Sequence, residues 1–278
     1  RFIAPIADLS ALAVKRDKSG SSDKGHCMST TTRIDNAALF AILSSLADNK
    51  QIIGRRYAYW CNGAPALEAA VAAAAMTQDE LGHARTLYPL LEDFVQADAD
   101  RAQVEPTTRT LRYWLAALDN DFQGWSDFVA TNFLLDNALT TFFEAAQNSS
   151  YEPLRQRARK IVQEEHLHQM HADGWVRRLA KVGGAVRAAL IAALERPWNE
   201  TLCWFGPNDD PVMQQLYREG SIDATPDELR SRYLQKIMPT LSNLDIAEPV
   251  SFNAVTKQWE LNQALPWTQW DRASRRLG

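Results

Sequence analysis

The chain has 278 residues, of which 46% are hydrophobic and 23% are charged, and its formal net charge is −4. A chain of this length can bury a substantial core, and the slightly negative charge argues against a nucleic-acid surface. No apolar run is long enough to cross a bilayer. Three widely spaced cysteines, Cys27, Cys61 and Cys203, argue against a disulfide framework and fit a reducing cytoplasm.

Residues 1–33 are predicted to be a flexible N-terminal segment or a remnant of expression that precedes a natural start at Met28. The opening stretch "RFIAPIADLSALAV" contains Asp8 and has no recognisable cleavage site, so it is not expected to be a signal peptide. The stretch "KRDKSGSSDKGHCMSTTT" that follows has the composition of a flexible linker.

Residues 34–183 are predicted to form a ferritin-like four-helix bundle. Apolar residues recur at helical spacing, and alanine and leucine, which favour helices, dominate the second helix. Breaks such as "CNGAP" and "QNSSYEP" separate the helices within each of two hairpins. A connector at 97–110 and a short helical stretch at 111–118 join the hairpins, which is the outline of a four-helix bundle. The predicted long helices cover residues 36–60, 66–94, 125–146 and 154–182.

Residues 184–278 are predicted to form a mostly helical C-terminal appendage packed on the bundle. Helical patterns cover 185–195 and 226–241, and "WFGPNDDP" at 204–211 is predicted to be a turn. The weak alternation at 249–261 predicts a small β-hairpin.

Four of the five histidines lie in two similar stretches, each with a Glu-x-x-His pattern. The first stretch pairs Glu80 with His83, and the second pairs Glu165 with His168. Residues three apart share one face of a helix, so both pairs can point into a bundle interior. Two such pairs plus a carboxylate from each remaining helix hold two iron or manganese ions in carboxylate bundles.

The positions of the turns predict which residues complete this group. The second hairpin turns near Ser150, which brings Asp136, a lone acid in an apolar run, level with Glu165. The first hairpin turns near Ala64, which brings Asp48 and Gln51 level with Glu80. The repeat that relates the two Glu-x-x-His pairs places Gln51, a weak neutral ligand, where the second hairpin has Asp136. Gln51 and Asp48 are therefore both candidate ligands.

Several neighbouring residues have other interpretations. Glu164 is an alternative ligand if the fourth helix is rotated, and Asp79 is a candidate hydrogen-bond partner for a histidine. His166 and His171 are expected to be exposed or to lie around the ligands. The two Glu-x-x-His pairs could also be no more than solvated helix faces. The basic clusters at 55–56, 155–160 and 177–181 are usually solvated as well, although one of them could hold an anionic substrate.

Several sequence strings resemble the A-type and C-type ferritin-like subunits of the bacterial phenylacetyl-CoA epoxidase, a multicomponent monooxygenase of phenylacetate degradation. The strings "LADN" at 46–49 and "WCNGAPALE" at 60–68 resemble the C-type subunit, which is a structural partner. The catalytic A-type subunit is resembled by "QDELGHA" at 78–84, "NFLLDNA" at 132–138, "SSYEPLRQRA" at 149–158, "EEHLHQ" at 164–169, "FGPNDD" at 205–210 and "DELRSRY" at 227–233.

The resemblance implies a di-iron centre carried by Glu80, His83, Asp136, Glu165 and His168. It also implies activation of O2 with electrons from a separate NAD(P)H-dependent flavin and iron–sulfur reductase. The substrate would be an aromatic coenzyme A thioester, and the partner a homologous ferritin-like subunit or a second copy of this chain. No nucleic-acid or membrane partner is expected.

One departure from the family pattern leaves two hypotheses. The A-type subunit has a glutamate on its first helix where this chain has Gln51. The first hypothesis is a di-iron oxygenase subunit. The alternative is a non-catalytic structural subunit that supports a catalytic homologue, and a ferritin-like iron-storage protein or oxidase is a weaker third.

Overall fold

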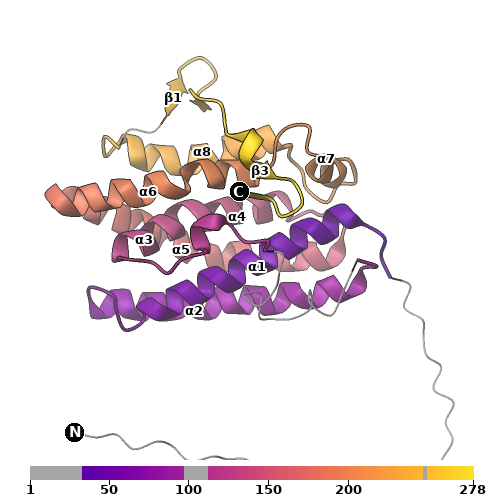
Figure 1. The fold of residues 1–278 in the computed structure, drawn as a ribbon, viewed down its shortest axis with the longest axis horizontal. Helices are drawn as coiled ribbons and strands as arrows, with labels where there is room; N and C mark the ends of the chain where they lie inside the picture. Colours follow the sequence, from indigo (N-terminus) through magenta and orange to yellow (C-terminus); the bar gives the residue numbers. More distant parts are fainter. Residues whose placement is uncertain (1–32, 97–111, 247–248) are drawn as a thin grey trace, which may run out of the picture. The chain divides into compact units, whose positions relative to one another are not determined.

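Two helical hairpins form the bundle that the sequence predicts (Figure 1). The first consists of α1 (Ala37–Trp60) and α2 (Leu67–Leu87). The second consists of α3 (Trp125–Thr131), the π-helix η4 (Asn132–Asp136) and α4 (Asn137–Ala145), followed by α5 (Glu152–Val182). The fold is therefore all-α and ferritin-like, as predicted.

The computed structural model describes residues 33–96, 112–246 and 249–278, which all belong to one unit, 33–278. The predicted flexible segment, apart from its last residue, and the connector at 97–110 lie outside the described residues. The proposed boundary between bundle and appendage falls at the junction of α5 and α6, and the division into two domains stays a prediction.

Helices α1 and α2 pack side by side at close range (Figure 1). Asn36 caps α1, because its side-chain oxygen accepts the N–H of Leu39 at 2.9 Å. A Cβ atom added to Gly54 would lie 2.9 Å from the side chain of Leu81 and 3.0 Å from Cβ of Glu80. The absence of a side chain at Gly54 therefore sets how closely α1 approaches the helix that carries Glu80.

Two predicted helical stretches are shorter than expected. The second helix was predicted to reach residue 94, but α2 ends at Leu87 and continues as the 3-10 helix η1 (Tyr88–Asp93). Pro89 explains the change, since proline has no N–H and disrupts the α-helical ladder. Of the stretch predicted at 111–118, only η3 (Ala116–Leu118) is helical within the described part.

The C-terminal part contains α6 (Gly184–Trp204), α7 (Pro211–Arg218) and α8 (Pro226–Ser242). Helix α6 contacts α3 and α5, and α8 contacts α4. The predicted hairpin exists as β1 (Val250–Asn253) paired antiparallel with β2 (Gln258–Leu261). The sequence interpretation missed α7 and a second short hairpin, β3 (Trp270–Asp271) with β4 (Arg276–Leu277).

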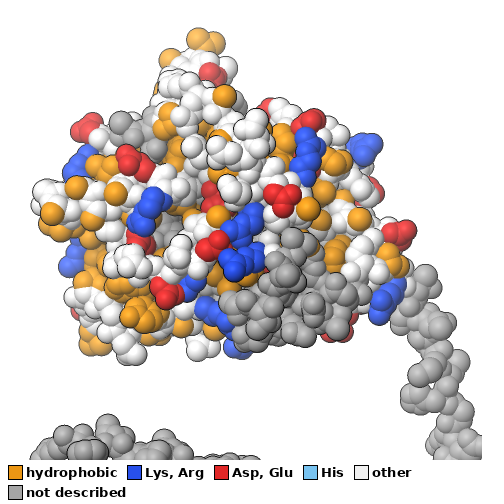
Figure 2. Space-filling model, viewed as in Figure 1, with side chains coloured by type: hydrophobic (Ala, Val, Ile, Leu, Met, Phe, Trp, Pro, Cys, Tyr) orange, Lys and Arg blue, Asp and Glu red, His pale blue; other side chains and the backbone are white. Residues whose placement is uncertain are grey.

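Every residue from Phe128 to Phe143 in the second hairpin is buried. The apolar residues of this segment surround the whole helix, which is typical of a helix enclosed by others. Charged side chains of both signs lie interspersed on the face shown in Figure 2. None of the helices in the described ranges is long and apolar enough to span a membrane.

Candidate metal centre

The structure brings the two Glu-x-x-His pairs and Asp136 together in the bundle interior. Glu80, Asp136, Glu165 and His168 are buried, and each offers one ligand atom within 4.8 Å of the others. His83 joins them, because its Nδ1 lies 3.3 Å from Oε1 of Glu165. The predicted residues therefore form one buried cluster, here called the centre, and they are not solvated helix faces.

The π-helix η4 presents Asp136 to the centre. Oδ2 of Asp136 lies 3.1 Å from Nδ1 of His168, which places the acid at the level predicted from the turn near Ser150. A π-helix accommodates an extra residue in a helical turn, and such turns are frequent at functional sites. All of η4 is buried, so its one charged side chain has to find its partners inside the protein.

Lys50 of α1 occupies the middle of the centre. Its Nζ atom lies 2.5 Å from Glu165, 2.6 Å from Asp136 and 3.1 Å from Glu80, and all four side chains are at most 2% exposed. Burial alone would lower the pKa of Lys50, but the charges of the three carboxylates raise it well above its ordinary value. Lys50 is therefore an ammonium ion that binds the same carboxylates that a metal would need.

Neither candidate ligand from α1 belongs to the group of four metal-binding atoms. Gln51 is buried, and its Oε1 has no hydrogen-bond partner among the described residues. Asp48 is also buried, and it accepts a hydrogen bond of 2.8 Å from the hydroxyl of Tyr88. Helix α1 thus contributes a cation to the centre, and the assignment of Gln51 or Asp48 as metal ligands stays a prediction.

Two outer acids hold the two histidines in a crossed arrangement. Nε2 of His83 on α2 donates to Glu164 of α5 at 2.9 Å, whereas Nε2 of His168 on α5 donates to Asp79 of α2 at 3.3 Å. The hydrogen bond from His168 lowers the pKa of Asp79. Each acid directly precedes a glutamate of the centre, so both hairpins hold the inner Nδ1 of a histidine toward the carboxylates in the same way.

The charged groups of the centre shift one another's pKa values. Burial would lower the pKa of both histidines, but the surrounding carboxylates raise it, most strongly for His168. Lys50 holds the pKa of Glu165 well below its ordinary value against the effect of burial. Burial and the neighbouring acids raise the pKa of Glu80 to about 7. Lys50 and the two histidines therefore offset much of the negative charge of the three carboxyl groups, of which Glu80 is the most easily protonated.

The remaining histidines of the second stretch lie outside this group. His166 is exposed. His171 is half-buried, and its Nδ1 lies 3.2 Å from Nδ2 of Asn132. Burial, with a smaller effect of His168, lowers the pKa of His171 to about 4, so its ring is neutral near pH 7.

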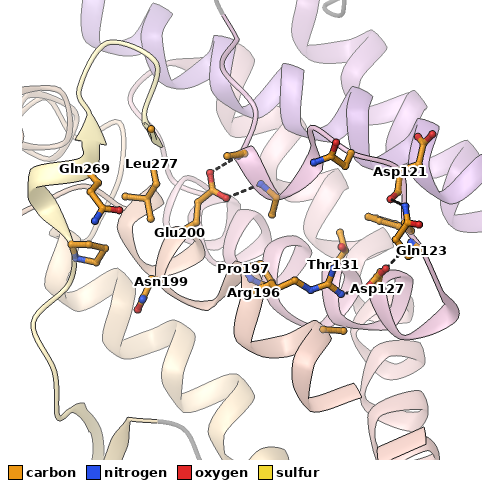
Figure 3. Close-up of a pocket in the computed structure, with 17 residues that line it drawn as sticks. Asp121, Gln123, Asp127, Thr131, Arg196, Pro197, Asn199, Glu200, Gln269 and Leu277 are labelled. Carbon is orange, nitrogen blue, oxygen red and sulfur yellow. Dashed lines mark hydrogen bonds and ion pairs between the residues drawn. The ribbon is translucent and has the colours of Figure 1, made fainter. Parts of the chain in front are cut away.

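A cavity of about 790 Å³ lies beside α3 and α6, and no residue of the centre lines it (Figure 3). Its walls are held by internal contacts. Glu200 accepts the N–H groups of Ala116 and Ala117, and Arg196 pairs with Asp127. A second cavity, of about 500 Å³ between α2 and α5, is lined by His83 and both outer acids, with Arg85, Arg157 and Lys160 also in its wall.

The sequence interpretation missed Lys50. It left the roles of the two outer acids open and did not predict their crossed arrangement. A signal for Lys50 does exist, because it is the one basic residue between Ala37 and Gly54 in a stretch of mostly apolar or small residues. Every residue from Ile42 to Gly54 is buried, so a lysine there cannot extend to solvent. A lysine that cannot reach water has to face buried acids.

Comparison with known proteins relates the chain to enzymes of phenylacetate breakdown. A family model described as phenylacetic acid catabolic protein matches residues 27–263. The chain is 30% identical over 192 residues to the A-type subunit of 1,2-phenylacetyl-CoA epoxidase from Escherichia coli (strain K12), covering 68% of this chain and 62% of that subunit. It is 23% identical over 212 residues to the C-type subunit of the same enzyme, covering 76% of this chain and 84% of that subunit. The match therefore spans less than two thirds of the length of the A-type subunit.

Proposed function

We propose that the chain, which belongs to the phenylacetic acid catabolic protein family, is a supporting ferritin-like subunit of an oxygenase complex, and that Lys50 takes the place of the metal pair in this subunit. Its relatives are subunits of an epoxidase, which makes an oxidoreductase complex the natural setting. In this role the chain would hold a ligand-complete homologue in its working conformation and would not itself activate oxygen.

The position of Lys50 carries this proposal. Its ammonium contacts Oε1 of Glu80, Oδ1 of Asp136 and Oε1 of Glu165. A divalent ion bound to these carboxylates would lie close to the ammonium. At about 4 Å and an effective dielectric constant of about 20, the two would repel by about 8 kcal/mol. Lys50 and a metal therefore compete for the same oxygen atoms.

Two iron ions do not fit the residues that are present. The second ion of a carboxylate bundle needs an acid from each helix, and α1 offers Lys50 and Gln51 at this level. Asp48, the nearest acid on α1, is hydrogen-bonded to Tyr88 and lies outside the group of donor atoms. The di-iron oxygenase predicted from the sequence thus lacks the ligand that α1 would have to provide.

A second candidate, a metal-dependent oxygenase subunit, is favoured by the remaining donors. Glu80, Asp136, Glu165 and His168 could hold one iron ion if the ammonium of Lys50 moved aside. A bound iron would supply the reductive activation of dioxygen. The outer acids would then keep the histidine rings oriented, and the buried bundle would exclude bulk water from the centre.

Metal content separates the two candidates. The wild type, Lys50→Met and His168→Ala are loaded with Fe(II) under anaerobic conditions, desalted and analysed for iron by mass spectrometry. The proposal expects far less than one ion per wild-type chain, and a gain of iron in Lys50→Met, where the four donors are released. One ion or more per wild-type chain, lost in His168→Ala, would refute the replacement by Lys50 and favour the second candidate.

The supporting role has its own test. The chain is co-expressed with a homologue of the A-type subunit, and the complex is isolated through a tag on one partner. We expect co-purification, with oxygen consumption that depends on the homologue and survives His168→Ala in this chain. Loss of oxygen consumption in that variant, with the complex intact, would contradict a purely supporting role.

A further inference from the structure

Five buried polar atoms without a hydrogen-bond partner among the described residues gather on one side of the centre. They are Tyr57 Oη, Trp60 Nε1, Trp125 Nε1, Asn132 Oδ1 and His171 Nε2. Native proteins satisfy about nine tenths or more of their buried polar atoms, with protein groups or ordered water. A concentration of such atoms in one place therefore points to a small molecule that bonds to them.

Ring contacts, together with the hydrogen bond of Asn132 to His171 at 3.2 Å, show that the residues carrying these atoms belong to one group. Phe128 joins two of them, because its ring lies 4.4 Å from that of Tyr57 and stacks at 4.3 Å on that of Trp125. The ring of Trp125 in turn contacts those of Trp60, at 5.8 Å, and His171, at 6.3 Å. We call this group the aromatic layer; it consists of Tyr57, Trp60, Trp125, Phe128, Asn132 and His171.

The aromatic layer adjoins the centre on three helices. Tyr57 follows Lys50 by two turns of α1 and so lies on the same face. Its burial and the charges of Asp136, Glu80 and Glu165 raise its pKa well above the ordinary value. Asn132 begins the π-helix that ends at Asp136, and His171 lies one turn after His168 on α5.

A surface cavity borders the aromatic layer at His171. It has a volume of about 310 Å³, lies between the start of α2 and α5, and is lined by Ala66, Glu68, Ala69, Met170, His171, Gly174, Trp175 and Arg178. His171 belongs to both the cavity and the aromatic layer. A Cβ atom added to Gly174 would meet nothing within 4 Å, so the cavity is open at this position.

We propose that ordered water molecules bind in the aromatic layer. They link the cavity at Gly174, through His171, Asn132 and Tyr57, to the buried centre, and water and protons exchange with solvent by this route. Water suits the atoms present, because it both donates and accepts. The indoles of Trp60 and Trp125 donate, whereas Oδ1 of Asn132 accepts. The neutral His171 ring accepts from Asn132 at Nδ1 and therefore donates at Nε2. This inference goes beyond the proposed function and holds whether Lys50 or a metal neutralises the carboxylates.

The first test measures exchange of the tryptophan indole N–H groups with solvent, by NMR of protein labelled with ¹⁵N-tryptophan. Trp204 is the reference, because it is buried and donates to Ser45 at 3.0 Å. We expect Trp60 and Trp125 to exchange at least about tenfold faster than Trp204, since bound water that communicates with solvent carries the hydrogen away. Equal, slow exchange of all three would overturn the proposal.

Two glycine variants test the route. Gly174→Leu fills the cavity and should slow the exchange of Trp60 and Trp125 by about tenfold or more, because the water path is closed. Gly82→Leu is the matched control. Gly82 is also a helical glycine with open space at its Cβ position, but it lines the 500 Å³ cavity beside the outer acids. An equal effect of both variants, or no effect of Gly174→Leu, would contradict the route.

Tyr57→Phe gives an independent readout in the sign of a Tm shift. If water bonds to the Tyr57 hydroxyl, its removal should lower Tm by about 2–4 °C. If the hydroxyl has no partner, its removal relieves an unsatisfied group, and Tm stays constant or rises. The second result would contradict the proposal, and a high-resolution crystal structure without water at Tyr57, Asn132 and His171 would do so as well.

Discussion

Replacing Lys50 by methionine keeps the length of the side chain and removes its charge. Three buried carboxylates then lose the cation that lies within 3.1 Å of each. Removing one partner of a buried ion pair costs about 3–5 kcal/mol, because the remaining charge stays buried without compensation. We therefore expect Lys50→Met to lower the free energy of unfolding by at least about this amount in metal-free protein at pH 8.

The effect should depend on pH in a defined direction. Without Lys50, burial and mutual repulsion raise the pKa of the carboxyl groups in the folded variant above their unfolded values; Glu80 is already at about 7 in the wild type. The folded variant then binds more protons than its unfolded state, so its stability falls as pH rises. The loss relative to wild type should be smaller at pH 6 than at pH 8.

The measurement is urea unfolding of the wild type and Lys50→Met at both pH values, with Lys236→Met as the matched control. Lys236 is partly exposed, with 17% of its side-chain surface accessible, and it pairs with one acid, Glu144, at 2.6 Å, whose side chain is 35% exposed. Its replacement should cost about 1 kcal/mol or less. The reasoning fails if Lys50→Met is no less stable than Lys236→Met, or if its loss does not grow with pH.

Three further variants probe the surroundings of the centre. Glu200→Ala removes the acceptor of two N–H groups of η3 and should cost about 1–3 kcal/mol, whereas the exposed Glu195→Ala on the same helix should have little effect; urea unfolding compares them. Gly54→Val brings a side chain against Leu81 and should lower stability by about 1–3 kcal/mol, with the open Gly82→Val as control in the same assay. Asp79→Asn keeps the size of the side chain but removes its charge near His168. The imidazole signals in NMR titrations should report a lower pKa for His168, and an unchanged value would refute the outer hydrogen bond.

Local spacing was sufficient to predict the bundle and most members of the centre. The Glu-x-x-His pairs place their side chains on one face because the α-helix has a fixed period, and the turn near Ser150 brought Asp136 to the level of Glu165. The same reasoning was weaker for α1, because level along a hairpin does not determine which side of the helix faces inward. Asp48, Lys50 and Gln51 were all within one turn of the predicted level.

The sequence by itself determined a carboxylate-bundle fold and five residues that meet inside it, since both follow from helical periodicity and hairpin symmetry. Only the tertiary structure decided what neutralises the buried acids. All of α1 from Ile42 to Gly54 is buried by helices distant in sequence, so Lys50 has no path to solvent and its ammonium binds Glu80, Asp136 and Glu165. A lysine is usually a surface residue, and its role here depends on the packing of four helices around it.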